Sequence, residues 1–293
     1  MAAPVGFIGL GQMGVPMVRN LLRAEFRVLG FDLNPQAAAA LAGEPGFSAA
    51  ASSRLVAQDC AVLILMLPDS AAVDRMLWQD DSGLARRLAR GNVVIDMGSS
   101  DPVHSRDNHA KLAPLGIAFV DAPVSGGRKR AVDGSLSIMI GGDKPAVEQV
   151  RPLLQALGKT LVHVGSAGGG HAVKALNNYV SAAGLLAVCE ALVAAEKFGI
   201  DPHLVNQVFN ASTGKNNTTE NKVENFMLPQ NFTSGFALAL MHKDLQTAQR
   251  FIERLRTPGE LAKCCLESWA QAEAGLEKGA DHTAMFKFVR DRA

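Results

Sequence analysis

The stretch VGFIGLGQMG, residues 5–14, joins a short apolar run to a turn with three glycines and then to a helical pattern. Gly9 permits the tight turn, Gly11 lets the backbone approach a phosphate without an intervening Cβ, and Gly14 lets the helix pack closely on the strand. The free N–H groups at the start of such a helix attract an anion. The spacing therefore predicts a dinucleotide-binding turn, made of Gly9, Leu10, Gly11, Gln12, Met13 and Gly14.

A second apolar run, residues 26–31, follows a predicted helix over residues 15–24 and ends at Asp32. Dinucleotide-binding folds carry at this position the acid that binds the ribose hydroxyls. A carboxylate accepts a hydrogen bond from a 2′-hydroxyl but repels a 2′-phosphate, and no arginine directly follows it. The sequence therefore favours NAD over NADP. The alternative is that Asp32 caps the loop before a helix starting at Pro35.

Length and composition indicate two domains and a small-molecule enzyme. A chain of 293 residues with 48% hydrophobic residues is long enough for two cores. A net charge of +1 with mixed signs gives no electrostatic reason to expect nucleic acid or a membrane surface as partner. No basic leader precedes the first predicted strand, so we expect neither a signal nor a transit peptide and a cytoplasmic location.

The cysteines and the longest apolar run have ordinary structural interpretations. Cys60, Cys189, Cys264 and Cys265 lack the spacing of metal ligands and make a poor disulfide framework, so we expect no metal site. Residues 179–195 are shorter than the roughly 20 apolar residues that cross a bilayer and are expected to form a buried helix.

The first half of the chain alternates apolar runs and helical segments. Runs over residues 60–67, 92–97 and 118–121 are predicted strands of a parallel sheet, and residues 137–141 and 161–164 are predicted to close it. We therefore predict an α/β fold, with a Rossmann-type NAD-binding domain over residues 1–164.

The pattern changes at the glycine-rich segment 165–170. A helix predicted over residues 171–198 is far longer than the typical length of about 12 residues, so we expect it to link two domains. Gly199 and Pro202 end it. The remaining chain is helical, which predicts an all-helical domain over residues 165–293.

Lys174 is the candidate for the group that transfers the substrate proton. It lies four residues before Asn178, so both share one face of the long helix. Small and apolar neighbours would let Lys174 enter a partly dry cleft between the domains, where burial lowers the pKa of a lysine. It could then accept a hydroxyl proton. Helical periodicity alone favours the alternative of an exposed lysine.

A second candidate is Ser125-Gly126-Gly127, which follows a predicted strand and so lies at the carboxyl edge of the sheet. The serine hydroxyl and the glycine N–H groups suit a carboxylate, although a plain Gly-Gly turn is equally compatible.

Three further residues could bear chemistry. His163 and His171 have no carboxylate partner at a readable spacing and are interpreted as structural. Lys243, beside Asp244, belongs either to a surface ion pair or to the site.

Four motifs carry a resemblance that spans the chain: FIGLGQMG at residues 7–14, DAPVSGG at 121–127, residues 168–178 and KDL at 243–245. The chain resembles the β-hydroxyacid dehydrogenase family, which includes 3-hydroxyisobutyrate dehydrogenase and tartronate semialdehyde reductase. The resemblance implies an amino-terminal Rossmann domain, a long interdomain helix and an all-helical second domain that often mediates dimers or tetramers.

The resemblance also implies residue roles. Lys174 corresponds to the catalytic acid/base and Asn178 to its partner at the substrate, while Ser125, Gly126 and Gly127 correspond to the carboxylate site. The residues expected to face the cofactor are Leu67, Pro68, Ser99 and Lys243, of which Lys243 is also expected to contact the substrate.

Departures from the family pattern concern the substrate. Gly98 stands where a serine is usual, and Asp101 adds a negative charge. The segment 212–217 lacks a tryptophan that 3-hydroxyisobutyrate dehydrogenases tend to carry. Asn216 and Asn217 suggest a polar substituent at C2 of the substrate.

The predicted function is NAD-dependent interconversion of a small C2-substituted 3-hydroxy acid and its semialdehyde. One alternative is a tartronate or succinic semialdehyde-type reductase with the same mechanism. A non-catalytic NAD-binding module is a further alternative, against which Lys174 and the lack of a basic tail argue. An imine reductase of similar fold would usually carry another proton donor in place of this lysine.

Overall fold

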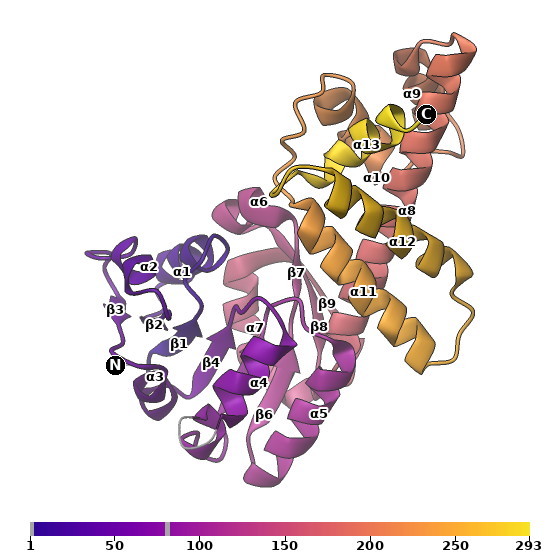
Figure 1. Cartoon of the computed structure of the whole chain (residues 1–293). Coiled ribbons are helices and arrows are strands. Elements are labelled where there is room, and N and C mark those ends of the chain that lie inside the picture. Colours follow the sequence, from indigo (N-terminus) through magenta and orange to yellow (C-terminus); the bar gives the residue numbers. More distant parts are fainter. Residues whose placement is uncertain (1–2, 80–82) are drawn as a thin grey trace. The chain divides into compact units, whose positions relative to one another are not determined.

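The computed structural model describes residues 3–79 and 83–293 (Figure 1). The chain divides into two compact units, Met1–Lys174 and Ala175–Ala293. The predicted boundary at residues 164/165 lies slightly earlier in the chain and stays a prediction. Each unit has its own hydrophobic core.

The first unit contains a nine-stranded sheet with the order β3-β2-β1-β4-β5-β6-β8-β7, in which β9 also pairs with β8. The strands are β1 (Val5–Ile8), β2 (Val28–Phe31), β3 (Phe47–Ala49), β4 (Val62–Leu65), β5 (Val93–Asp96), β6 (Ala118–Asp121), β7 (Val124–Ser125), β8 (Leu136–Gly141) and β9 (Gly158–Gly165). Pairing is parallel from β3 through β6, which confirms the Rossmann-type α/β fold.

Side chains from the strands are buried on both faces of this sheet. In β4, Ile64 packs into one core cluster while Leu63 and Leu65 pack into the other, as the twofold alternation of a strand requires. Helices cover both faces, so the central strands β1, β4 and β5 are buried almost throughout, whereas β3 and β9 are largely exposed. The helices are α1 (Gly14–Arg23), α2 (Pro35–Ala39), α3 (Ser53–Asp59), α4 (Ser70–Trp78), α5 (Pro102–Leu112), α6 (Gly127–Asp133) and α7 (Lys144–Leu157).

The end of the sheet differs from the fully parallel arrangement that we expected. β8 pairs antiparallel with β6 at Asp121↔Gly141 and antiparallel with β7. β3 and β7 were not predicted. They have three and two residues, too few to show a hydrophobic period, and an apolar run carries no signal for strand direction.

The second unit is helical. The long helix α8 (Gly169–Phe198) begins in the first unit and continues through the second, where its buried Leu185, Cys189 and Leu192 pack with Trp269 and Phe286. The other helices are α9 (Pro202–Ala211), α10 (Asn217–Asn221), α11 (Leu238–Arg254), α12 (Glu260–Gly275) and α13 (Met285–Asp291), with a π-helical turn over Val223–Met227. This agrees with the predicted all-helical carboxyl-terminal part and long helix.

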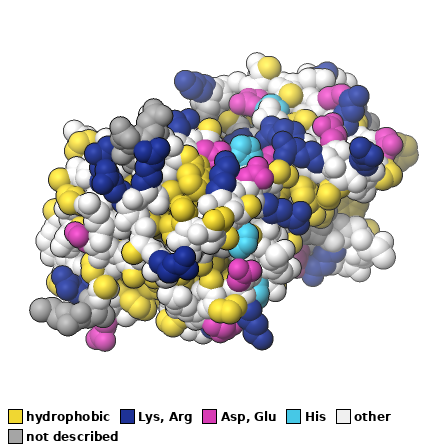
Figure 2. Space-filling view, turned by 90° about the horizontal axis from the view of Figure 1, so that it is seen from below, with side chains coloured by type: hydrophobic (Ala, Val, Ile, Leu, Met, Phe, Trp, Pro, Cys, Tyr) yellow, Lys and Arg dark blue, Asp and Glu magenta, His cyan; other side chains and the backbone are white. Residues whose placement is uncertain are grey.

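Within residues 3–79 and 83–293, α8 alone is long and apolar enough to cross a bilayer. Leu185, Cys189 and Leu192 contribute to the core of the second unit, whereas Val180 is 67% exposed, so the helix that we expected to be buried over residues 179–195 is buried only in part. On the surface, Figure 2 shows Lys and Arg side chains interspersed with Asp and Glu on the face in view. This agrees with the near-zero net charge of the chain.

Candidate cofactor and substrate site

The glycine-rich turn joins β1 to α1 at the carboxyl edge of the sheet. Gly9 has φ +102°, and a Cβ on Gly14 would lie 1.9 Å from the carbonyl oxygen of Gly9, so both positions need glycine. A Cβ on Gly11 would meet nothing within 4 Å. In the part of the chain that the structure describes, the N–H groups of Gly11 and Gln12 bind no protein acceptor. The turn therefore presents an open cradle that fits a pyrophosphate.

Asp32 follows β2 and lies against this turn. Its Oδ2 accepts a hydrogen bond from the Leu10 N–H at 2.6 Å, and its Oδ1 accepts one from the Asn34 N–H at 2.8 Å. Each carboxylate oxygen keeps acceptor capacity, which suits ribose hydroxyls. The helix cap that we considered for Asp32 belongs instead to Asn34, whose side chain accepts from the Gln36 N–H.

The loops after β4 and β5 meet the glycine-rich turn at the same edge. A Cβ on Gly9 would lie 2.3 Å from the Met66 carbonyl oxygen, and a Cβ on Gly98 would lie 2.5 Å from that of Leu67. This close packing leaves no room for a Cβ at Gly98 in this chain. The same contacts place Leu67, exposed Pro68 and partly buried Ser99 along the edge that carries the cradle.

The turn Ser125-Gly126-Gly127 joins β7 to α6. Gly126 has φ +125° and Gly127 has φ +63°, so both adopt backbone conformations that favour glycine. A Cβ on Gly127 would meet nothing within 4 Å, whereas the stem of Arg130 covers Gly126. Ser125 is partly buried. The turn thus has free space on the side of Gly127.

Lys174 is buried on the first part of α8, with 8% of its surface exposed, rather than lying on a solvated helix face. Its Nζ donates a hydrogen bond to the Val124 carbonyl oxygen at 2.8 Å. This bond holds Nζ beside the residue that precedes Ser125. The proton-transfer candidate and the carboxylate-binding candidate are therefore neighbours within the first unit.

Asn178 lies one turn after Lys174 on α8 and belongs to the second unit. Its Nδ2 donates to Asp244 Oδ2 at 2.6 Å, and Lys243 Nζ lies 3.8 Å from Asp244 Oδ1. Asp244, which is 5% exposed, thus orients both candidates. No local spacing predicts this role for Asp244, because Asn178 and Asp244 lie 66 positions apart on different helices.

Two residues noted as departures from the family have structural partners. Asp101 caps α5 by accepting a hydrogen bond from the Val103 N–H at 2.8 Å. Asn216 caps α10, with Oδ1 accepting from the Thr218 and Thr219 N–H groups. Asn217 is exposed. The suggested link between these asparagines and the substrate stays a prediction.

The cysteines are thiols of low reactivity for the most part. Burial raises the pKa of Cys60 to about 11 and that of Cys265 to about 12, while Cys264 is exposed. Across the described residues, no group of three or more His, Cys, Asp or Glu side chains is arranged to hold a metal ion.

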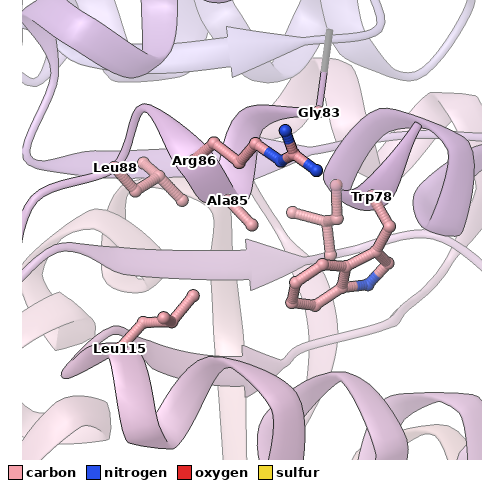
Figure 3. Close-up of a pocket in the computed structure, with 7 residues that line it drawn as sticks. Trp78, Gly83, Ala85, Arg86, Leu88 and Leu115 are labelled. Carbon is pink, nitrogen blue, oxygen red and sulfur yellow. The ribbon is translucent and has the colours of Figure 1, made fainter. Parts of the chain in front are cut away.

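A cavity of about 390 Å³ lies away from the carboxyl edge of the sheet that carries the candidate site (Figure 3). Its lining residues precede β5 and β6 in the chain and so lie toward the amino ends of those strands. They are Leu77, Trp78, Gly83, Ala85, Arg86, Leu88 and Leu115.

Family models match both parts of the chain. Residues 4–165 match the NAD-binding domain of 6-phosphogluconate dehydrogenase, and residues 168–289 match the NAD-binding domain of NADP-dependent 3-hydroxyisobutyrate dehydrogenase. The chain is 37% identical to an NAD-dependent L-serine dehydrogenase from Pseudomonas aeruginosa, over 84% of each protein.

Two solved structures extend this similarity over nearly the whole chain. A Mycobacterium tuberculosis 3-hydroxyisobutyrate dehydrogenase with L-serine gives a TM-score of 0.91 at 31% identity, covering 99% of this chain and 100% of that one. Psf3 in complex with NADP⁺ and 2-OPP gives 0.84 at 26% identity, covering 97% and 99%. The chain belongs to the β-hydroxyacid dehydrogenase family of NAD(P)-binding oxidoreductases.

Proposed function

We propose that this protein catalyses the reversible, NAD-dependent oxidation of a small C2-substituted 3-hydroxy acid to its semialdehyde. The observation that carries the proposal is the burial of Lys174 beside the Ser125-Gly126-Gly127 turn, within the unit that holds the open glycine cradle. A buried amine next to a turn with open space beside Gly127 combines a site for the substrate carboxylate with a group for proton transfer.

Each residue has one task in this scheme. Ser125 and the N–H groups of Gly126 and Gly127 hold the substrate carboxylate. Lys174 accepts the proton of the C3 hydroxyl during oxidation and returns it during reduction. Asn178, oriented by Asp244, positions the hydroxyl. The nicotinamide, when bound, accepts the hydride from C3.

The preference for NAD is supported by Asp32. Its carboxylate lies against the glycine turn, where the negative charge would repel a 2′-phosphate. The similar Psf3 structure holds NADP⁺, so the family accommodates both cofactors and the choice in this protein rests on Asp32 and its neighbours.

The proposed substrate class is supported by the relatives. L-serine is the substrate in the name of one relative and is bound in one similar structure, and it is itself a 3-hydroxy acid with a polar C2 substituent. We therefore place serine, glycerate and related acids ahead of purely aliphatic ones. A semialdehyde reductase working in the opposite direction uses the same residues and is the second candidate.

We also propose that the protein is a cytoplasmic homo-oligomer without nucleic acid or membrane partners. In the second unit, apolar side chains on α8 and α9 are exposed, including Val180 at 67%, Leu204 at 57% and Val208 at 60%. Apolar surface of this kind supports burial against a second copy.

The proposal is tested by following NADH formation with purified protein. NAD and NADP are each paired with L-serine, glycerate, 3-hydroxyisobutyrate and 3-hydroxypropionate, and the corresponding semialdehydes are tested with NADH. We expect turnover with NAD on an acid with a polar C2 group. Best turnover on 3-hydroxyisobutyrate contradicts the polar C2 group, and inactivity with every acid while NADH still binds favours a non-catalytic binder.

A further inference from the structure

The first turn of α8 carries a fully buried histidine that the proposed reaction does not use. His171 is 0% exposed, and its ring lies between two carboxylates, 3.7 Å from Asp121 and 3.9 Å from Asp96. Both aspartates are at most 1% exposed. Buried carboxylates are stable only when they are paired or hydrogen-bonded. The hydrogen bonds of this cluster therefore identify the segments that it fixes.

The two carboxylates end neighbouring strands and bind different segments. Asp121, at the end of β6, accepts hydrogen bonds from the Gly168 and His171 N–H groups at 2.7 and 2.9 Å. Asp96, at the end of β5, accepts from the Gly98 N–H at 3.0 Å and from the Ser100 hydroxyl at 2.7 Å. Asp121 thus fixes the start of α8, and Asp96 fixes the loop that contains Ser99.

The imidazole of His171 connects these two segments. Its Nε2 donates to the Gly98 carbonyl oxygen at 3.3 Å, and its Nδ1 lies 2.7 Å from the Ser105 hydroxyl. The Ser105 hydroxyl also lies 3.2 Å from the Asp101 carbonyl oxygen, within the first turn of α5. Both ring nitrogens are therefore occupied by contacts with these segments, and the ring is flanked by the two carboxylates.

We propose that His171 is a positioning residue for the reaction: it clamps the Gly98–Ser100 loop to the first turn of α8. Lys174 lies one turn further along this helix, and Ser99 lies in the clamped loop. The clamp therefore fixes the proton-transfer group relative to a cofactor-facing loop. This inference rests on the proposed function for its effect on turnover, whereas the clamp itself is a property of the fold.

Two amide variants separate the two bonds of the ring. The amide nitrogen of His171→Gln comes close to the position of Nε2 and can still reach Gly98, whereas that of His171→Asn comes close to Nδ1 and reaches only Ser105. Both variants replace the ring by a neutral amide, so their difference reports the Gly98 bond. His104→Gln is the matched control, because it loses a contact with Asp74 on the same unit outside the cluster.

We expect His171→Asn to lower kcat by about 10²-fold with little change in KM for the acid, because misplacement of a reacting group by about 1 Å costs this much. His171→Gln should restore most of this loss, and His104→Gln should match the wild type. Amide hydrogen exchange should accelerate at residues 98–100 and in the first turn of α8 in the Asn variant but not in the Gln variant.

Equal kcat values for the Gln and Asn variants, or the reverse order, would overturn the clamp. If the wild-type protein turns over no hydroxy acid, the proposed function fails and the exchange measurement decides the clamp by itself. Faster exchange at residues 98–100 in the Asn variant alone supports it, and equal exchange in both variants overturns it.

Discussion

Lys174 is the residue whose replacement distinguishes a dehydrogenase from a dinucleotide-binding module. Lys174→Ala removes the proposed proton acceptor and leaves the glycine cradle intact, so we expect kcat to fall by about 10² to 10⁴ while NADH affinity is retained. Steady-state kinetics and NADH fluorescence titration measure the two quantities. The exposed Lys263→Ala is a control, and near-normal turnover of Lys174→Ala would exclude the assigned role.

Asp32 is expected to set the cofactor preference. Asp32→Ala removes the charge that repels a 2′-phosphate, so the ratio of kcat/KM for NAD to that for NADP should fall. We expect kcat/KM to decrease with NAD and to increase with NADP. An unchanged ratio would mean that another residue discriminates the ribose.

Gly11 and Gly14 form a matched pair in one turn. A Cβ on Gly14 meets the Gly9 carbonyl oxygen at 1.9 Å, so Gly14→Ala should destabilise the fold by about 2 kcal/mol or more. A Cβ on Gly11 meets no protein atom within 4 Å, so Gly11→Ala should melt like the wild type but bind NADH more weakly. Thermal melting and NADH titration separate the two effects. A Gly11→Ala protein with full NADH affinity contradicts the cradle.

Some individual residues were placed correctly before the fold was known. The sequence predicted that the three glycines form the turn after the first strand and that Asp32 follows the second, because this spacing along one βαβ unit is local. The burial of Lys174 was not readable, because periodicity along α8 is weak and favoured an exposed side chain. The resemblance to known dehydrogenases, rather than the helical pattern, is the source of the role proposed for it.

Asp281 ties together the elements of the second unit around α13. It accepts hydrogen bonds from the Ser234 hydroxyl, the Gly235 N–H and the Thr283 N–H and hydroxyl. Burial by itself raises the pKa of Asp281, but hydrogen bonds from His282, Thr283 and Ser234 outweigh it and hold the pKa well below its usual range. The charged form is therefore the stabilising one.

We expect Asp281→Asn to lower the free energy of unfolding at pH 7 by about 2 to 3 kcal/mol. A depressed carboxyl pKa contributes stability that is present above the unfolded-state pKa near 4 and is lost as the pH falls below it. The difference in the free energy of unfolding between wild type and variant should thus narrow as the pH falls from about 4 to about 2, as measured by urea unfolding. Asp291→Asn, at an exposed position, is the control. A difference in the free energy of unfolding that does not change with pH contradicts a stabilising role for the charged form of Asp281.

Elements were predicted best where they are long or buried. The predicted strand over residues 118–121 agrees with β6, and the predicted helix over 171–198 agrees with α8 to within two residues. The direction of β8 was not predicted, because hydrogen-bond pairing with β6 and β7 decides it and the sequence of β8 is apolar in either direction.

The molecule as a whole is expected to be an oligomer whose contact includes α9. Leu204 and Val208 lie one turn apart on this helix and are both largely exposed. The double variant Leu204→Asp/Val208→Asp should reduce the molar mass in light scattering, because charges at an apolar interface resist burial. Leu255→Asp, at a similarly exposed position beyond α11, is the control. An unchanged mass contradicts an interface on α9.

Local sequence was enough for the Rossmann-type domain, the turn with three glycines and the long helix, because each depends on spacing within one or two adjoining elements. The tertiary structure alone brought His171 between Asp96 and Asp121, joined Asn178 to Asp244, and buried Lys174 beside Val124. These contacts connect residues 50 or more positions apart. Their proximity depends on strand order and helix packing, which no short stretch of the sequence specifies.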